Sequence, residues 1–204
     1  MELSELLRRR RMCRSFRSET VDQTLIDDLC ELALFSPTAG NSAGVRMTTV
    51  ATDQVPAYLD VATDESWRAS SPRFVGLSRA GAVVIVTSRP QDYFERYAQR
   101  DKASSGLAEP DTWVVPYWHT DAAMATMALL LLLEERGLGA TLWGNFRHDA
   151  DVLAWAGARD EVLFATVLIG APDGEDHPSG SLAREVPTRR QRVRRVARGD
   201  SGER

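Results

Sequence analysis

The sequence predicts an α+β fold in which helices surround a small mixed β-sheet. Apolar segments of strand length alternate with segments of helical periodicity, and several connections between them are long and irregular. A third observation is the run 122–133, which is apolar except for Thr126 and contains no Gly, Pro or charge. Its Ala, Leu and Met residues favour a helix, and a helix that is apolar on every side is expected to be buried.

This central helix has clear ends. Thr120 or Asp121 can cap its start, and Gly137 stands where a left-handed C-cap is expected. Charged residues at 134–136 end the apolar run before the roughly 20 residues that a membrane span needs. A 204-residue monomer offers little cover for such a helix, so we expect part of it to pack on a second copy of the chain.

The first half of the chain is expected to hold three helices and one strand. Helical spacing of apolar residues covers 3–10, 22–35 (with Asp22 as its cap) and 54–62, and alternation over 46–52 predicts a strand. The segment 12–16 is predicted to be extended, 36–44 to be a loop and 65–77 to be irregular.

In the second half, Val-Val-Ile-Val within 81–88 predicts a central strand. A polar helix over 90–102 and a long loop over 103–116 precede the central helix. Further strands are predicted at 140–143 and 162–169, with a helix at 149–156 between them. A doubly wound parallel fold is the alternative, but Gly137-Leu138-Gly139 follows a helix and therefore does not fit a dinucleotide-binding fingerprint.

Composition favours a single domain over 1–204. Hydrophobic residues make up 43% and charged residues 26%, which is ordinary for a soluble protein, and the net charge of −4 gives no reason to expect nucleic acid or membrane partners. Cys13 and Cys30 form neither a disulfide framework nor a metal-ligand cluster, and no export signal is present, so a cytoplasmic location is expected.

Arginines crowd both ends of the chain. They are either solvated side chains or parts of one anionic site, and a nucleic-acid arm is disfavoured because no stacking aromatics are interleaved with them. The sequence lacks a G-x-S-x-G elbow, an H-E-x-x-H motif and a phosphate-binding P-loop. We therefore expect no catalytic side chain and no metal, and any enzymatic chemistry is expected to come from a bound cofactor.

Five segments occur in an order that is typical of one flavoprotein family. They are 10–16 with Val21 (R-R-M-C-R-S-F…V), 36–41 (S-P-T-A-G-N), the central helix with 137–139 (G-L-G), 167–172 (V-L-I-G-A-P), and Arg189-Arg190 with Val196. Together they resemble the nitroreductase-like FMN-dependent oxidoreductases, and the resemblance covers nearly the whole chain. It implies a helix-surrounded sheet, a homodimer and an FMN site.

The resemblance also implies which residues hold FMN. Arginine suits a phosphate because its planar guanidinium donates two hydrogen bonds at once. The implied set places arginines on the phosphate and ribityl chain, the 37–41 loop on the ring from the neighbouring subunit, and a strand backbone along the flavin edge. Its members are Arg10, Arg11, Met12 and Arg14; Pro37, Thr38, Ala39 and Asn41; Leu142, Trp143 and Gly144; and Arg189 or Arg190, in a 184–204 tail expected to extend over the partner.

Two departures from the family pattern matter. Met12 replaces a Ser of the motif, and 41–45 reads Asn-Ser-Ala-Gly-Val where the family has N-x-Q-P-W. They leave open a catalytically degenerate flavin-binding, or flavin-free, interaction protein on the same fold.

Substrate selectivity is expected between residues 97 and 119. The candidates are Tyr97, Lys102, Trp113, Trp118 and His119. Aromatic rings with few charges suit a flat substrate, although these aromatics could equally cap the core. The implied activity is reduction of FMN by NAD(P)H, followed by two-electron transfer to a small nitroaromatic or quinone-like acceptor by ping-pong kinetics.

Overall fold

The computed structural model describes residues 2–145, 147–176 and 183–196. Its four strands are β1 (Val45–Val50), β2 (Ala82–Ser88), β3 (Gly139–Trp143) and β4 (Val162–Gly170), in the order β1-β2-β4-β3. All three neighbouring pairs are antiparallel. The predicted α+β class is confirmed. The expected mixed sheet and the parallel alternative are both wrong for the described strands.

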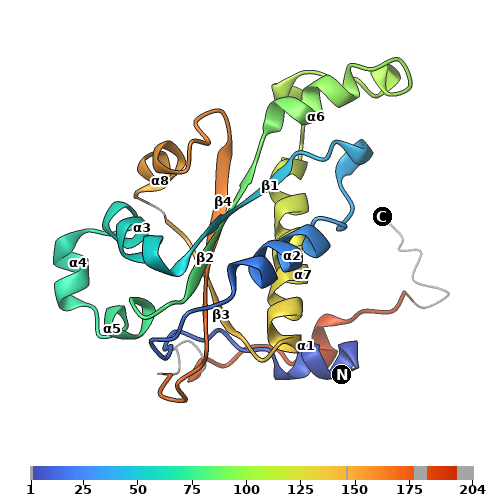
Figure 1. Cartoon of the computed structure of the whole chain (residues 1–204). Coiled ribbons are helices and arrows are strands. Elements are labelled where there is room, and N and C mark those ends of the chain that lie inside the picture. The colour runs from blue at the N-terminus through green and yellow to red at the C-terminus, as the bar shows by residue number, and fades with distance from the viewer. Residues whose placement is uncertain (1, 146, 177–182, 197–204) are drawn as a thin grey trace.

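Helices cover both faces of the sheet (Figure 1). On one face lie α2 (Gln23–Ala33) and α7 (Tyr117–Glu135), and on the other lie α3 (Val55–Ala62) and α8 (Asp149–Trp155). Every residue of β2 is buried, with Val84 and Val86 in the first core and Val83 and Ile85 in the second. The alternation of a strand's side chains explains why a continuous apolar run serves two cores.

The central helix α7 begins earlier than predicted. Its N-cap is Pro116, so the expectation that Thr120 or Asp121 caps it is wrong, and both residues lie inside the helix. Its C-terminal end is as expected: Gly137 adopts φ +72°, and the Leu138 N–H donates to the Leu133 carbonyl at 2.9 Å.

Within one chain α7 is buried on one side only. Asp121, Ala122, Ala125, Thr126, Leu129, Leu130 and Leu133 form the buried face. On the opposite side Ala123 is exposed and Met124 is 42% exposed. The apolar character therefore continues onto a face that this chain leaves uncovered. No helix in the described ranges has the length and apolar content needed to span a membrane.

Four further helices are α1 (Leu3–Arg9), α4 (Glu65–Ser70), α5 (Phe74–Leu77) and α6 (Pro90–Tyr97). The segment 65–77, expected to be irregular, forms α4 and α5, and Trp67 and Phe74 pack edge to face across them with ring centroids 5.9 Å apart. Such short helices leave no repeating pattern in the sequence. Helix α6 ends at Tyr97, sooner than predicted, and short 3-10 turns follow at Ala103–Ser105 and Pro110–Thr112.

Candidate functional site

The first residues after α1 run alongside β3. Since β3 is an edge strand, its outer backbone groups are free to pair with this segment. The Cys13 N–H donates to the Ala140 carbonyl at 2.9 Å, and the Leu142 N–H donates to Met12 Sδ at 3.4 Å. This extended segment therefore lies against the open edge of the sheet, as the sequence predicted for 12–16.

Arg10 carries unpaired donors in this region. Its Nε and Nη1 atoms are out of contact with solvent and have no hydrogen-bond partner among the described residues. Leaving buried donors of a charged group without partners costs about 1–3 kcal/mol or more. Anionic acceptor oxygens that reach these two donors would satisfy them.

The neighbouring arginines differ from Arg10. Arg11 Nη1 donates to the carbonyls of Arg8 (2.6 Å), Arg10 (3.0 Å) and Arg9 (3.2 Å), so Arg11 stabilises the end of α1. Arg14 Nη1 donates to the Met12 carbonyl at 3.3 Å. Of the arginines predicted near the N-terminus, Arg10 therefore has the unsatisfied donors and Arg11 has a structural role.

A groove with a volume of about 420 Å³ follows this segment along the C-terminal end of α7. Its lining includes Arg9, Arg11, Met12, Cys13, Glu134 and Gly139. Arg9 pairs with Glu134 at 3.3 Å, which fixes α1 to this end of the helix. Burial raises the pKa of the Cys13 thiol, so the thiol favours its neutral form here.

The end of β3 presents the predicted flavin edge. Leu142 is 37% exposed, whereas the Trp143 indole is half-buried and stacks on Trp67, with centroids 5.7 Å apart and planes at 27°. The Leu142 N–H faces the open edge, where it meets Met12 Sδ, and Gly144 follows directly after the strand. A cavity of about 280 Å³, lined by Trp143, Gly144 and Trp67 among others, opens here.

A buried polar network that the sequence did not reveal supports this strand end. The Tyr58 hydroxyl donates to Thr166 Oγ1 at 2.8 Å, and Asn145 Nδ2 donates to the Tyr58 oxygen at 3.2 Å. Thr166 Oγ1 in turn lies 3.0 Å from Asn145 Oδ1. Burial raises the pKa of Tyr58, so its phenol stays protonated and can donate. These three residues are far apart in sequence, which left no local signal.

The predicted 37–41 loop lies elsewhere, beside the start of α7. The Ala39 N–H donates to Asp121 Oδ2 at 2.8 Å, and the Ala43 N–H donates to Thr38 Oγ1 at 3.1 Å. Asn41 adopts φ +57°, which Asn tolerates better than most residues. Pro37 and Asn41 are exposed, so the loop offers these two side chains outward.

The two halves of the predicted site are therefore at opposite ends of α7. A 19-residue helix is about 28 Å long, with the loop at its N-terminal end and α1 at its C-terminal end. Figure 1 shows the same separation. One chain does not bring Arg10 and the 37–41 loop together.

The substrate candidates gather at the loop end. Tyr97 and Trp113 have ring centroids 4.9 Å apart, and Trp113 and Trp118 are 5.9 Å apart. Lys102 Nζ lies 5.8 Å from the centre of the Tyr97 ring, and the His119 ring lies 6.2 Å from Trp118. These rings mostly meet edge to face, the arrangement that aromatic pairs prefer. The candidates form one cluster, and much of their surface packs on one another.

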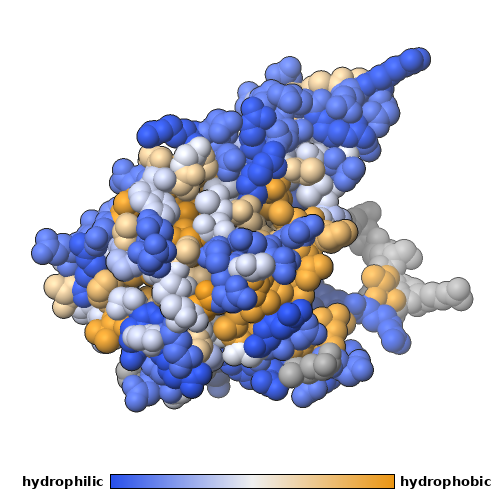
Figure 2. Space-filling view, in the orientation of Figure 1, coloured by the Kyte–Doolittle hydropathy of each residue, from blue (hydrophilic) through white to orange (hydrophobic). Residues whose placement is uncertain are grey.

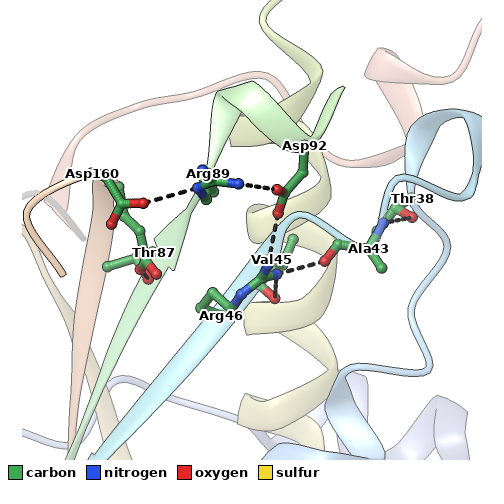
Figure 3. Close-up of polar contacts among 9 residues, drawn as sticks. Thr38, Ala43, Val45, Arg46, Thr87, Arg89, Asp92 and Asp160 are labelled. Atoms are coloured by element: carbon green, nitrogen blue, oxygen red, sulfur yellow. Dashed lines mark hydrogen bonds and ion pairs between the residues drawn. The ribbon is translucent and has the colours of Figure 1, made fainter. Parts of the chain in front are cut away.

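A chain of ion pairs lies next to the C-terminal end of the loop, near Ala43 (Figure 3). Arg46 Nη2 contacts Asp92 at 2.7 Å, Arg89 Nη1 contacts the second Asp92 oxygen at 2.7 Å, and Arg89 Nε contacts Asp160 at 2.9 Å. Arg46 Nη1 also donates to the Ala43 carbonyl at 2.6 Å. The series links β1, α6 and the turn before β4 to the end of the loop, and the sequence did not predict it.

The arginine-rich tail leaves the body of the molecule in the structure. Residues 183–196 are exposed, and Arg189 and Arg190 lie at a short 3-10 turn over Arg190–Arg192. None of the described hydrogen bonds or ion pairs joins Arg189 or Arg190 to Arg10. The last part of the predicted 184–204 tail, residues 197–204, lies outside the described residues.

A family model described as the nitroreductase family matches residues 7–171. The chain belongs to the nitroreductase family. The match spans the N-terminal segment, the loop, α7 and all four strands, so the family predicted from five short motifs is confirmed. No curated protein matches the chain.

Solved nitroreductases share the fold. CinD from Lactococcus lactis, in complex with nicotinic acid, is 17% identical with a TM-score of 0.67, over 92% of this chain and 100% of CinD. A family protein from Streptococcus pneumoniae TIGR4 is 18% identical with a TM-score of 0.69, over 95% and 100%. A nitroreductase from Exiguobacterium sibiricum, in complex with FMN, is 16% identical with a TM-score of 0.66, over 92% and 94%. At these identities the likeness establishes the nitroreductase fold.

Proposed function

We propose that this nitroreductase-family chain is an FMN-dependent oxidoreductase that uses NAD(P)H to reduce a small flat acceptor, such as a nitroaromatic or a quinone. The observation that carries the proposal is the Arg10 guanidinium, which has two buried donors without a partner among the described residues and stands two residues before the segment that contacts β3. A flavin phosphate has the charge and the oxygen atoms that such donors need. The FMN complex of the Exiguobacterium relative supports the choice of cofactor.

In this proposal Arg10 and Arg14 hold the phosphate and the ribityl chain. Leu142 and Gly144 turn backbone N–H groups toward the ring edge, and Met12 holds the Leu142 N–H through its thioether. Because a thioether is a weak acceptor, a better acceptor on a ligand can replace it at little cost. When bound, FMN supplies the ability to accept hydride from NAD(P)H and to pass two electrons to a second substrate.

We infer that the active form is a homodimer. The 37–41 loop and Arg10 lie at opposite ends of α7, which is about 28 Å long, so Pro37, Thr38, Ala39 and Asn41 would reach a flavin only if it is bound by a second copy. Exposed apolar side chains on α1, α7 and the end of α2 offer the surface for that copy; they include Leu7, Leu32, Phe35 and Met124. Figure 2 shows apolar residues gathered on this face. The tail would then extend over the partner, with Arg189 or Arg190 at its phosphate.

The aromatic cluster is proposed to face the substrates. In the dimer its position beside the loop brings Tyr97, Trp113 and Trp118 toward the partner's flavin, where flat surfaces suit a nicotinamide or a flat acceptor. Lys102 adds a positive charge near the rings. Burial lowers the pKa of His119, so it is neutral at pH 7 and the proposal assigns it no proton transfer. Protons come from solvent. We also infer a cytoplasmic location, since both cysteines are free thiols.

A second candidate is a flavin-free or degenerate interaction protein on the same fold. Met12 favours it, because this side chain already occupies the Leu142 N–H where the family motif has a serine. This reading leaves the buried donors of Arg10 without a purpose.

The two candidates are separated by titrating the purified protein with FMN and recording its visible spectrum and flavin fluorescence. We expect a stoichiometric complex whose flavin band bleaches when NADH or NADPH is added without oxygen. Arg10→Ala should weaken FMN binding roughly a hundredfold, because two charge-assisted hydrogen bonds are lost. Arg11→Ala is the matched control and should change the FMN Kd little. A wild-type protein that binds no FMN would support the second candidate instead.

A further inference from the structure

Asp121 is a buried carboxylate that the sequence suggested only as a helix cap. It is 1% exposed, and it accepts hydrogen bonds from the Ala39 N–H at 2.8 Å and from the Tyr93 hydroxyl at 2.9 Å. Thr120 Oγ1 lies 3.4 Å from its other oxygen. Both principal donors come from outside α7, so the carboxylate joins three separate parts of the chain.

No ion pair within the described ranges includes Asp121. Burying a carboxylate without a cation is costly unless donors surround it. Its place in the second turn of α7 gives some compensation, because the positive end of the helix dipole lies nearby. A residue this expensive to bury holds its donors firmly, and one of those donors is the backbone of the predicted flavin-facing loop.

Tyr93 completes the arrangement. Its side chain is fully buried, and burial, together with the hydrogen bond to Asp121, raises its pKa, so the hydroxyl remains a donor. The Tyr93 ring also packs against Gly44, where an added Cβ would lie 2.3 Å from the ring. One side chain therefore fixes Asp121 and the end of the loop together.

Other α6 residues hold the middle of the loop. Arg96 Nε donates to the Gly40 carbonyl at 2.8 Å, and a Cβ at Gly40 would lie 2.8 Å from the Tyr97 ring. In this chain the positions of the family's Gln-Pro-Trp are Ala43, Gly44 and Val45. The contacts from α6 and Asp121 fix a loop that lacks that tripeptide.

We propose that Asp121, supported by Tyr93, is a positioning residue: its carboxylate holds the Ala39 N–H so that the Thr38–Asn41 loop keeps the shape in which it covers the flavin bound by the neighbouring copy. This inference rests on the proposed function. It assigns to Asp121 an effect on a site that its own chain does not contain. In an Asp121→Ala chain the Ala39 N–H would bond to water instead. The loop would then have to be ordered when flavin binds, and this entropic cost would weaken binding.

The first experiment measures FMN affinity and backbone hydrogen exchange in the full-length protein. Asp121→Ala should weaken FMN binding roughly tenfold, since a hydrogen bond to a charged group is lost. In the FMN-free protein it should speed exchange in peptides that cover 36–44. Asp121→Asn keeps an acceptor for Ala39 and should recover most of both properties, and Tyr93→Phe should fall between the two. Thr126→Ala is the matched control, because Thr126 is buried on the same helix face and bonds only the Ala122 carbonyl.

The second experiment mixes differently tagged Arg10→Ala and Asp121→Ala chains and purifies the heterodimer. If the loop acts on the neighbouring copy, one site of the heterodimer carries both defects and the other carries none. The heterodimer should then bind one FMN with wild-type affinity, whereas each parent homodimer binds weakly. A loop acting on its own chain would leave no intact site.

The inference is overturned if Asp121→Ala binds FMN like the wild type, if Thr126→Ala weakens binding equally, or if the heterodimer has no wild-type site. Should Asp121→Ala not fold, Tyr93→Phe and Asp121→Asn carry the test. A wild-type protein that binds no FMN would refute the proposed function. In that case faster exchange at 36–44 in Asp121→Ala would still measure the hold on the loop.

Discussion

The two ends of α7 are built differently. At the C-terminal end, two donors of Arg10 have no partner and the N–H of Leu142 rests on a thioether. At the N-terminal end, the loop donors and acceptors are matched by Asp121, Thr38 and Arg96. The C-terminal end has strong donors without partners, whereas at the N-terminal end the polar groups are paired and hold the loop backbone in place.

This difference suggests a division of labour in the proposed dimer. Unpaired donors allow a ligand to contribute free energy, since each unsatisfied buried group is a cost that binding removes. A loop that is already fixed contributes few new hydrogen bonds to a ligand, but it lowers the entropic cost of binding because it does not have to be ordered. The ligand-binding end of one copy and the preformed end of the other would then make one site.

The largest effect is predicted for a substitution that destabilises α7, the helix between the two ends. Leu129 is fully buried in the middle of α7, so Leu129→Ala should lower the free energy of unfolding by about 2–5 kcal/mol through lost burial and a cavity. Urea unfolding measures this. Met124→Ala, on the exposed face, should stay within about 0.5 kcal/mol of the wild type at protein concentrations where the chain is monomeric. Equal losses would show that both faces are buried in the single chain.

The two ends should also differ in how substitutions change thermal stability with and without FMN. Arg10→Ala should not lower the thermal midpoint of the FMN-free protein, because the removed donors have no partner to lose and the cost of burying them unpaired is removed. At FMN concentrations a hundred times the wild-type Kd, the wild type should gain about 2.7 kcal/mol of stability, whereas a variant that binds a hundredfold more weakly should gain only about 0.4 kcal/mol. Arg96→Ala, which loses bonds to Gly40 and Asp101, should lower the midpoint with or without FMN. A large FMN-independent loss for Arg10→Ala would contradict the open-end interpretation.

A smaller effect tests how tightly the loop end is packed. Gly44→Ala places a Cβ 2.3 Å from the Tyr93 ring, so overpacking should cost about 1–3 kcal/mol of stability. Gly106→Ala is the control: it has φ +70° and nothing within 4 Å, so it should lose only the cost of a left-handed backbone, about 1 kcal/mol. Calorimetry compares the two. A tolerated Gly44→Ala would mean that Tyr93 moves freely, and the preformed loop would lose its support.

The smallest effect concerns acid. Near the Arg10 end, Asp173 accepts from Ser15 Oγ at 2.6 Å and pairs with Arg79 at 2.8 Å. The Ser15 hydrogen bond, then the Glu175 backbone N–H and the charge of Arg79, hold the pKa of Asp173 below its usual value. A depressed pKa stabilises the fold above the unfolded-state pKa near 3.9, and this part is lost as the pH falls below about 4. Urea midpoints from pH 6 to pH 3 should therefore fall less steeply for Asp173→Asn than for the wild type.

The parts of the fold that follow a repeating pattern could be predicted from the sequence. The apolar run of β2, the helical run of α7 and the left-handed Gly137 each depend on local spacing, and the structure has all three. The helices at 65–77 could not be predicted, because they are too short to leave a repeating pattern and their Trp67–Phe74 contact joins residues of two separate helices. The exposure of one side of α7 could not be predicted either, since the spacing of apolar residues in the sequence does not reveal how many elements cover a helix.

The candidate site was predictable as a set of segments rather than as contacts. The arginine run identified the region, yet only the structure shows that Arg11 turns back to α1 while Arg10 keeps its donors. Asp121 has the local signal of a helix cap, and its actual donor, the Ala39 N–H, is 82 residues away in sequence. Which partner a polar side chain takes depends on tertiary distances that a linear pattern does not contain.

The segment beside β3 has a consequence for solubility. An uncovered edge strand offers its backbone to other chains, and such edges promote aggregation. Met12 and Cys13 occupy this edge through Leu142 and Ala140, so the stretch that leads from Arg10 also shields the sheet from unwanted strand addition. Removing residues 1–13 would therefore expose the aggregation-prone edge of β3 and also remove the Arg10 donors proposed to bind the ligand.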